Sequence, residues 1–146
     1  MSGFRSLSAS VLASPQITAG DIAEARELGV TLVVNNRPEG EAADQVPGDQ
    51  IAEAARTAGL DYRAIPIDHS GFSMAQVEAM VDALESARGK VLAYCRSGTR
   101  STLLWALAAA SKGADPEAIS QAAAAAGYDV APVRALIEML ASQRSK

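Results

Sequence analysis

The sequence predicts an α/β domain in which helices cover both faces of a largely parallel β-sheet. Short apolar runs, typical of buried strands, alternate with segments bounded by helix-capping residues and glycines throughout residues 31–112. Strands that are joined through helices pair in parallel with right-handed crossovers. The chain has 146 residues, of which 49% are hydrophobic and 21% charged, and this balance suits one compact domain over residues 1–146.

The predicted helices begin at capping residues. Thr18 with Asp21 and Ser73 with Gln76 have the spacing of capping boxes, and Asp115 precedes a proline at the first helical position. Glycines follow several of these segments, as expected at helix ends. The predicted helices cover residues 19–28, 51–58, 74–87, 102–112, 116–126 and 132–145.

Apolar runs predict strands at residues 31–35, 62–67 and 91–94, and residues 4–12 are expected to add one or two edge strands. In open α/β sheets, ligands bind beyond the carboxyl ends of the strands. Three loops meet that criterion, at residues 35–40, 68–71 and 95–100. Because these loops follow successive strands, we expect a shared site that contains Asn35, Arg37, Asp68, His69, Cys95, Arg96 and Arg100.

Cys95 is the only cysteine, and it lies where a predicted strand passes into a predicted helix. A lone cysteine is most often a small buried hydrophobic residue. Here its neighbours are polar and cationic, and the N–H groups of the loop and of the helix N-terminus favour a thiolate and a bound anion. Arg96 and Arg100 add positive charge, and Gly98 allows the backbone to approach a ligand. We expect Cys95 to be a nucleophile in an anion-binding loop that includes Ser97, Gly98 and Thr99.

Composition narrows the classes of partner. The net charge of −4 argues against nucleic-acid binding and against a basic membrane-surface patch, and no apolar run is long enough to cross a bilayer. Residues 1–10 lack the pattern of a secretion signal, and one cysteine makes no internal disulfide, so we expect a cytoplasmic setting. One histidine and one cysteine give no metal-binding spacing, and we expect no metal and no cofactor.

Three motifs resemble the phosphatase-like domain of the beta-lactamase hydrolase-like proteins. They are Val-Val-Asn-Asn-Arg-Pro-Glu-Gly-Glu at 33–41, Ile-Pro-Ile at 65–67 and Tyr-Cys-Arg-Ser-Gly-Thr-Arg-Ser at 94–101. The resemblance implies a fold similar to the protein-tyrosine and dual-specificity phosphatases, with a four- or five-stranded sheet. It also implies that Cys95 is the nucleophile, that Arg100 clamps the anion and that Ser101 steadies the thiolate. Asp68 lies on the loop where those phosphatases keep a general acid.

The cysteine loop departs from the phosphatase signature in two ways. Tyr94 stands where those enzymes have histidine, and four residues, not five, separate Cys95 from Arg100. The shorter loop resembles that of the rhodanese-like sulfurtransferases. One residue fewer means one backbone donor fewer, so a tetrahedral phosphoryl group would be held less completely than the terminal sulfur of a persulfide.

Three functions are therefore open. The loop length favours sulfur transfer through a persulfide on Cys95, with a sulfane-sulfur donor, glutathione as a possible acceptor and a fused or operon-encoded partner enzyme of sulfur metabolism. Hydrolysis of a small anionic phosphomonoester, with Asp68 as the acid, is the alternative. The third hypothesis is a non-catalytic anion- or redox-sensing module.

Several loop residues have two open interpretations. The His69 side chain either forms a hydrogen bond at the site or is solvated. The Arg37 side chain either contacts the anion bound at the cysteine loop or lies away from it. Acidic residues of the loop after the first predicted strand are expected to be solvated, namely Glu39, Glu41 and Asp44.

Overall fold

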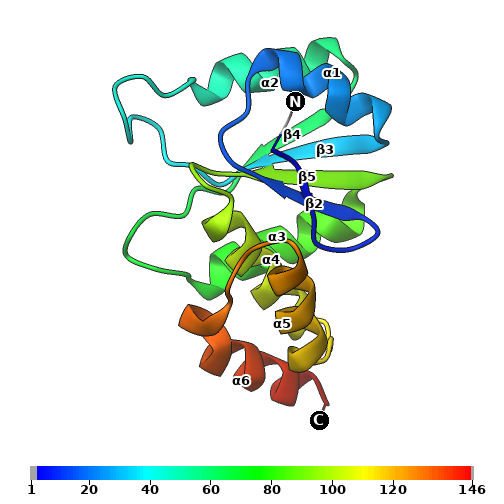
Figure 1. The fold of residues 1–146 in the computed structure, drawn as a ribbon, viewed down its shortest axis with the longest axis vertical. Helices are drawn as coiled ribbons and strands as arrows, with labels where there is room; N and C mark the ends of the chain where they lie inside the picture. Colours follow the sequence, from blue (N-terminus) through cyan, green and yellow to red (C-terminus); the bar gives the residue numbers. More distant parts are fainter. Residues whose placement is uncertain (1–2, 146) are drawn as a thin grey trace.

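The computed structural model describes residues 3–145 and contains, within that range, a five-stranded, mostly parallel sheet (Figure 1). The strand order is β1-β2-β5-β3-β4, and only the edge strand β1 is antiparallel to its neighbour. This arrangement confirms the predicted fold class and places the strand that precedes Cys95 at the centre. The strands are β1 Arg5–Ser6, β2 Val11–Ser14, β3 Val30–Asn35, β4 Asp61–Ala64 and β5 Lys90–Tyr94.

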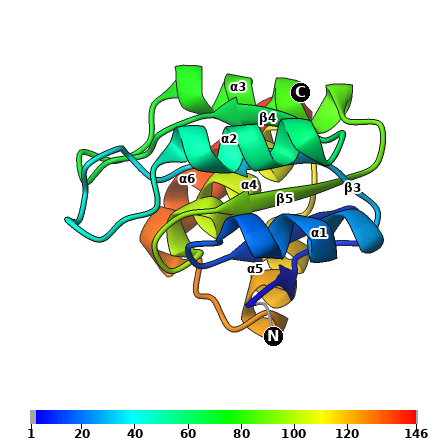
Figure 2. The ribbon, with the colours of Figure 1, turned by 90° about the horizontal axis from the view of Figure 1, so that it is seen from above.

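Helices cover both faces of the sheet. Two of them, α1 and α2, lie side by side on one face, and the other four lie on the opposite face (Figures 1 and 2). The first face carries α1 Ala19–Glu27 and α2 Gly48–Thr57, and the second carries α3 Met74–Ser86, α4 Thr99–Ser111, α5 Pro116–Ala125 and α6 Arg134–Ser145. A short 3₁₀ turn at Ala131–Val133 precedes α6.

Each face of the sheet has its own hydrophobic cluster. Leu92 and Tyr94 of β5 belong to the smaller cluster beneath α1 and α2, whereas Val91 and Ala93 belong to the larger one. This division follows from the alternation of side chains along a strand. The larger cluster centres on α4, which is buried along most of its length and contacts α3, α5 and α6. A helix that is apolar on all sides, as α4 is, requires such a central position.

The predicted caps are present. The Ser73 hydroxyl accepts the N–H of Gln76, whose side chain accepts the N–H of Ser73 in return. Thr18 and Asp21 form the other capping box. Asp115 caps α5 through the N–H of Ala118.

Several boundaries differ from the predicted ones. The helix predicted at 51–58 begins at Gly48, after Pro47 as its N-cap. The strand predicted at 62–67 ends at Ala64, because Pro66 has no N–H to donate to the sheet. Ile65 and Ile67 still donate to the carbonyls of residues 35 and 36, so the chain continues alongside the end of β3. The helix predicted at 102–112 begins at Thr99, because Gly98 can take the conformation of its N-cap. The last helix follows a 3₁₀ turn and does not begin at residue 132.

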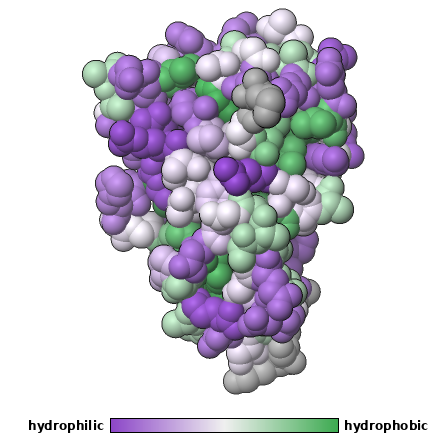
Figure 3. Space-filling view, in the orientation of Figure 1, coloured by the Kyte–Doolittle hydropathy of each residue, from purple (hydrophilic) through white to green (hydrophobic). Residues whose placement is uncertain are grey.

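No helix among residues 3–145 is long and apolar enough to cross a membrane. On the face shown in Figure 3, hydrophobic residues lie in small groups among hydrophilic ones. The large hydrophobic side chains that are exposed in the described part of the chain are Leu28, Met74 and Met139.

Leu104 offers a test of the central position of α4. Its side chain is fully buried in the larger cluster, so Leu104→Ala leaves a cavity and should lower the free energy of unfolding by about 2–5 kcal/mol. Urea unfolding followed by circular dichroism measures the loss. Met139→Ala, on the exposed side of α6, is the control and should cost less than about 0.5 kcal/mol. Equal losses in the two variants would contradict a core built around α4.

Candidate active site

The segment that contains Cys95 is held between the ends of two neighbouring strands. The Cys95 N–H donates to the carbonyl of Ser14 at the end of β2, and the Asn36 N–H donates to the Tyr94 carbonyl from the end of β3. Gln16 donates its N–H to the carbonyl of Arg96. The cysteine loop is therefore anchored by backbone bonds on both sides at the carboxyl edge of the sheet.

The sulfur of Cys95 lies in a polar, enclosed position. The Gly98 N–H points at Sγ, with an N···S distance of 3.1 Å. Gly98 has a φ of +92° and is the N-cap of α4, so the sulfur also faces the positive end of the helix. Cys95 itself is 0% exposed, so a substrate reaches the sulfur only after a neighbouring group moves.

The loop satisfies part of its own hydrogen bonding. The Thr99 N–H donates to the Ser97 hydroxyl at 3.3 Å, and that hydroxyl donates to the hydroxyl of Thr99. The Thr102 hydroxyl donates to the Gly98 carbonyl. Two N–H groups of the loop, those of Gly98 and Thr99, thus have partners within the loop itself.

Arg100 is bound in a fork by Glu41. Its Nη1 and Nη2 atoms lie 2.8 and 2.9 Å from the two carboxylate oxygens, and Nη1 also donates to the Ile67 carbonyl at 2.7 Å. The pKa of Arg100 is raised, first by the hydrogen bonds to Glu41 and, against the opposing effect of burial, also by Cys95. The Arg100 guanidinium therefore lies close to Cys95 as well as to Glu41.

Glu41 also binds Arg37, and the expectation that Glu41 is a solvated loop residue is wrong. Arg37 Nε donates to the same carboxylate at 3.0 Å, and Arg37 Nη1 donates to Gln16 at 2.9 Å. The hydrogen bond from Arg100 is the largest cause that lowers the pKa of Glu41 to about 2, with Arg37 adding to it and burial opposing it. Arg37, 5% exposed, thus reaches the site through Glu41. Glu39 and Asp44 are exposed, as expected.

Ser101 and Asn36 form a buried pair beside the loop. The Ser101 hydroxyl donates to Asn36 Oδ1 at 2.7 Å, and Asn36 Nδ2 donates to the Ile65 carbonyl. In this arrangement the hydroxyl proton of Ser101 is directed at Asn36 and not at the sulfur. Asn36 was not among the predicted site residues, although it lies within the Asn-Asn-Arg motif. Its neighbour Asn35 accepts the N–H of Arg37 and so shapes the same turn.

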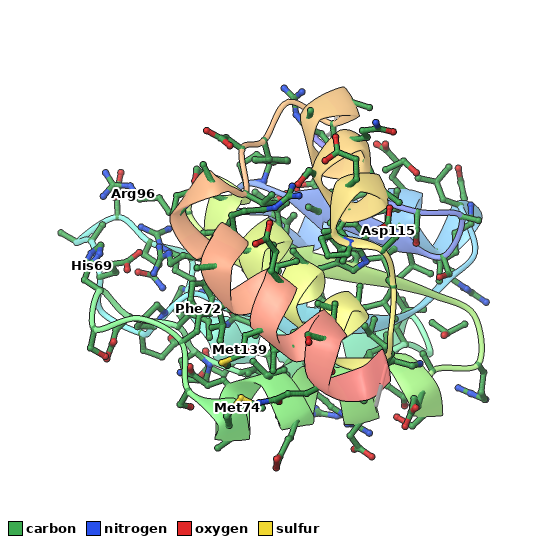
Figure 4. All side chains as sticks on the ribbon, turned by 90° about the horizontal axis from the view of Figure 1, so that it is seen from below. His69, Phe72, Met74, Arg96, Asp115 and Met139 are labelled. Atoms are coloured by element: carbon green, nitrogen blue, oxygen red, sulfur yellow. The ribbon has the colours of Figure 1, made fainter. Side chains whose placement is uncertain are left out.

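Asp68 and His69 lie on the neighbouring loop, and both are exposed. Asp68 accepts hydrogen bonds from the hydroxyl and the N–H of Ser70, and these bonds lower the pKa of its carboxyl group. Asp68 is therefore ionised at neutral pH, whereas a general acid must carry a proton. His69 and Arg96 lie at the edge of the molecule, on the same side (Figure 4). They form an exposed rim and make no part of the enclosed site.

Tyr94, which replaces the histidine of the phosphatase signature, contributes packing. Its side chain is buried in the cluster beneath α1 and α2, and burial raises the pKa of its phenol. Among residues 3–145, no group of three or more His, Cys, Asp or Glu side chains could hold a metal ion. The chemistry that this site offers is thus that of a buried thiol beside an arginine and a helix N-terminus.

The fold is that of the protein tyrosine phosphatases. Tk-PTP in its active form superposes with a TM-score of 0.72 over 97% of each chain, at 20% identity. A candidate phosphatase from Neisseria meningitidis Z2491 is more similar, with a TM-score of 0.84 and 29% identity over 96% of this chain and 99% of that one. A candidate phosphatase from Shewanella putrefaciens CN-32 has a TM-score of 0.74 and 23% identity, and covers 99% and 94% of the two chains.

The chain belongs to the family of the phosphatase-like domain of the beta-lactamase hydrolase-like proteins, whose model matches residues 3–114. The beta-lactamase hydrolase-like protein of Xylella fastidiosa is 38% identical over 79 residues, which are 54% of this chain. That of Agrobacterium fabrum is 35% identical over 85 residues, or 58% of this chain. The matched segments span only 18% and 20% of those relatives, so this chain corresponds to a small part of each.

The low pKa of Glu41 gives a pH-dependent prediction. Because folding lowers this pKa from 4.5 to about 2, Glu41 stabilises the fold above pH 4.5, and this stabilisation is lost as the pH falls toward 2. Glu41→Gln should lower the free energy of unfolding by on the order of 2 kcal/mol at pH 7 and by clearly less at pH 3. Denaturant unfolding at the two pH values measures the difference.

Glu53→Gln is the matched control, because Glu53 pairs with Arg56 on the exposed surface of α2. Its substitution should change stability by less than about 1 kcal/mol at either pH. If Glu41→Gln lost the same free energy at pH 7 and pH 3, the carboxylate would not be the stabilising group.

Proposed function

We propose that this domain is a cysteine-dependent phosphatase in which Cys95 attacks a phosphomonoester. The observation that carries the proposal is the position of the sulfur, bound by the Gly98 N–H at the head of α4 and beside Arg100. The family and the similar solved structures support phosphatase chemistry. They do not support the preference for sulfur transfer that the loop length alone suggested.

In the proposed reaction, the Cys95 thiolate attacks phosphorus, an S–P bond forms, and the P–O bond to the leaving group breaks. Water then attacks the phosphocysteine, which releases phosphate and restores the thiolate. N–H groups of the loop and the Arg100 guanidinium stabilise the charge on the non-bridging oxygens in both steps. For the phosphoryl group to reach Arg100, Glu41 must give up part of its bidentate contact.

The state of Asp68 indicates a class of substrate. Because Asp68 is exposed and its pKa is held down by Ser70, it is a poor proton donor as it stands. An aryl phosphate, whose phenolate leaving group needs less help from an acid than an alkoxide does, is the substrate that this site suits best. P. aeruginosa TpbA, a structural neighbour at 17% identity, has been solved in complex with pTyr, which is an ester of this kind.

Sulfur transfer is the second candidate, and the four-residue loop favours it. Two of the N–H groups of the loop are already engaged, which leaves few donors for a tetrahedral phosphoryl group. In this reaction the thiolate attacks a sulfane sulfur, an S–S bond forms on Cys95, and the donor leaves as an anion. A second thiol, such as glutathione, then takes the outer sulfur. A fused or separately encoded partner enzyme of sulfur metabolism belongs to this candidate.

Hydrolysis of aryl phosphates tests the first candidate. We expect measurable release of inorganic phosphate from p-nitrophenyl phosphate, and Cys95→Ser should abolish it while the fold is retained. Because Asp68 is a poor proton donor, Asp68→Asn should change the rate less than about threefold with either p-nitrophenyl phosphate or phenyl phosphate. Asp44→Asn, an exposed acidic residue of another loop, is the control and should change neither rate.

Intact mass tests the second candidate on the same protein. Thiosulfate or a low-molecular-weight persulfide should leave the mass of the wild-type chain unchanged if the domain is only a phosphatase. A gain of one sulfur atom, removed by cyanide or glutathione and absent in Cys95→Ser, together with no phosphate release, would replace phosphatase by sulfurtransferase as the function.

A further inference from the structure

Tyr128 contacts the cysteine loop from a part of the chain that the family model does not match. It follows the end of α5, whereas the matched segment ends at residue 114. Its hydroxyl donates a hydrogen bond to the Ser97 carbonyl, with an O···O distance of 3.2 Å.

The bond made by Tyr128 and the bond made by Cys95 lie at opposite ends of one peptide unit. The carbonyl of Ser97 and the N–H of Gly98 belong to the same amide, which is planar and trans, so that its O and H atoms point in opposite directions. Tyr128 binds the oxygen, and the Cys95 sulfur accepts from the N–H. Rotation of this one plane would break both bonds together. A hydrogen bond to the oxygen also polarises the amide and strengthens its N–H as a donor.

Tyr128 also fills the space beside Gly98. A Cβ atom built on Gly98 would lie 2.2 Å from the Tyr128 hydroxyl oxygen and 3.2 Å from the carbonyl carbon of Ser14. The positive φ of Gly98 already disfavours any other residue. The phenol therefore closes the side of the loop where a side chain would otherwise fit, and limits how far the plane of this peptide can turn.

The position of Tyr128 is itself fixed by its surroundings. Its N–H donates to the Ala123 carbonyl at the end of α5, and Gly127 before it has a φ of +94°. Arg5 of β1 donates to the Ala126 carbonyl at 3.1 Å and holds this helix end against the sheet edge. Burial is the main cause that raises the pKa of the Tyr128 phenol, so at neutral pH it keeps the proton that it donates.

We propose that Tyr128 is a positioning residue for the nucleophile, and that it holds the Ser97–Gly98 peptide so that the Gly98 N–H stays on the Cys95 sulfur. The expected effect of Tyr128 on catalysis rests on the proposed function. Its expected effect on the ionisation of the Cys95 thiol does not, because nucleophilic chemistry of any kind at Cys95 needs the thiolate. The test therefore measures the thiol directly.

The experiment is the pH dependence of alkylation by iodoacetamide, which is specific because Cys95 is the only cysteine. Tyr128→Phe keeps the ring and removes the hydrogen bond. We expect the pH midpoint of alkylation to rise by about half to one unit, which corresponds to the worth of one hydrogen bond. A change in access to the buried sulfur would multiply the rate equally at every pH and would leave the midpoint in place.

Asp129→Ala is the control. Asp129 caps the next turn of the same segment through the N–H of Ala131 and does not bind the cysteine loop. It should leave the midpoint unchanged even if it lowers the melting temperature. A midpoint in Tyr128→Phe equal to that of the wild type, or an equal shift in Asp129→Ala, would overturn the proposal. A shifted midpoint in a protein that hydrolyses no phosphate ester would sustain this inference and refute the proposed function.

Discussion

The carboxylate of Glu41, held between two arginines, is the interaction on which the site depends. It joins the loop after β3 to the first turn of α4 through Arg100, and through Arg37 it reaches Gln16 after β2. Two guanidinium groups on one carboxylate leave a net positive charge, which suits a thiolate neighbour. A buried charge must be paired to be tolerated, so removal of any one member leaves the others without compensation. The geometry of the site is therefore set by charge pairing among loops that are far apart in the sequence.

This pairing also fixes the orientation of the Arg100 guanidinium. Glu41 presents two oxygens to Arg100, much as two oxygens of a phosphate or sulfate ester would. Glu41 thus orients the arginine, and the Cys95 sulfur is enclosed. A substrate anion must compete with an internal one, which favours ligands with more negative charge than a single carboxylate.

Local signals in the sequence were sufficient for most of the elements and for the position of Cys95 between a strand and a helix. The capping pairs, the apolar runs and the strand–cysteine–helix junction each act over a few residues, and the structure contains all of them. The resemblance pointed to Arg100, and in the structure this arginine lies near Cys95 and binds Glu41. What the sequence did not reveal are contacts between distant segments. Glu41 looks like any acidic loop residue until its pairing with Arg100, 59 positions away, is known. Gln16 and Tyr128 were missed for the same reason, since nothing in their neighbourhood marks a polar contact with a loop elsewhere.

The central helix α4 has a consequence for the dynamics of the site. The loop that binds the sulfur leads directly into the first turn of α4. The rest of α4 is the most buried of the helices that pack in the larger cluster. Local opening reactions, by which many active sites gain flexibility, usually involve segments with few buried contacts. Here the helical half of the site belongs to the most protected part of the molecule, and its amides should exchange with solvent only through near-global unfolding. Mobility for substrate entry is therefore left to the segment that carries Glu41 and to the loop after β4.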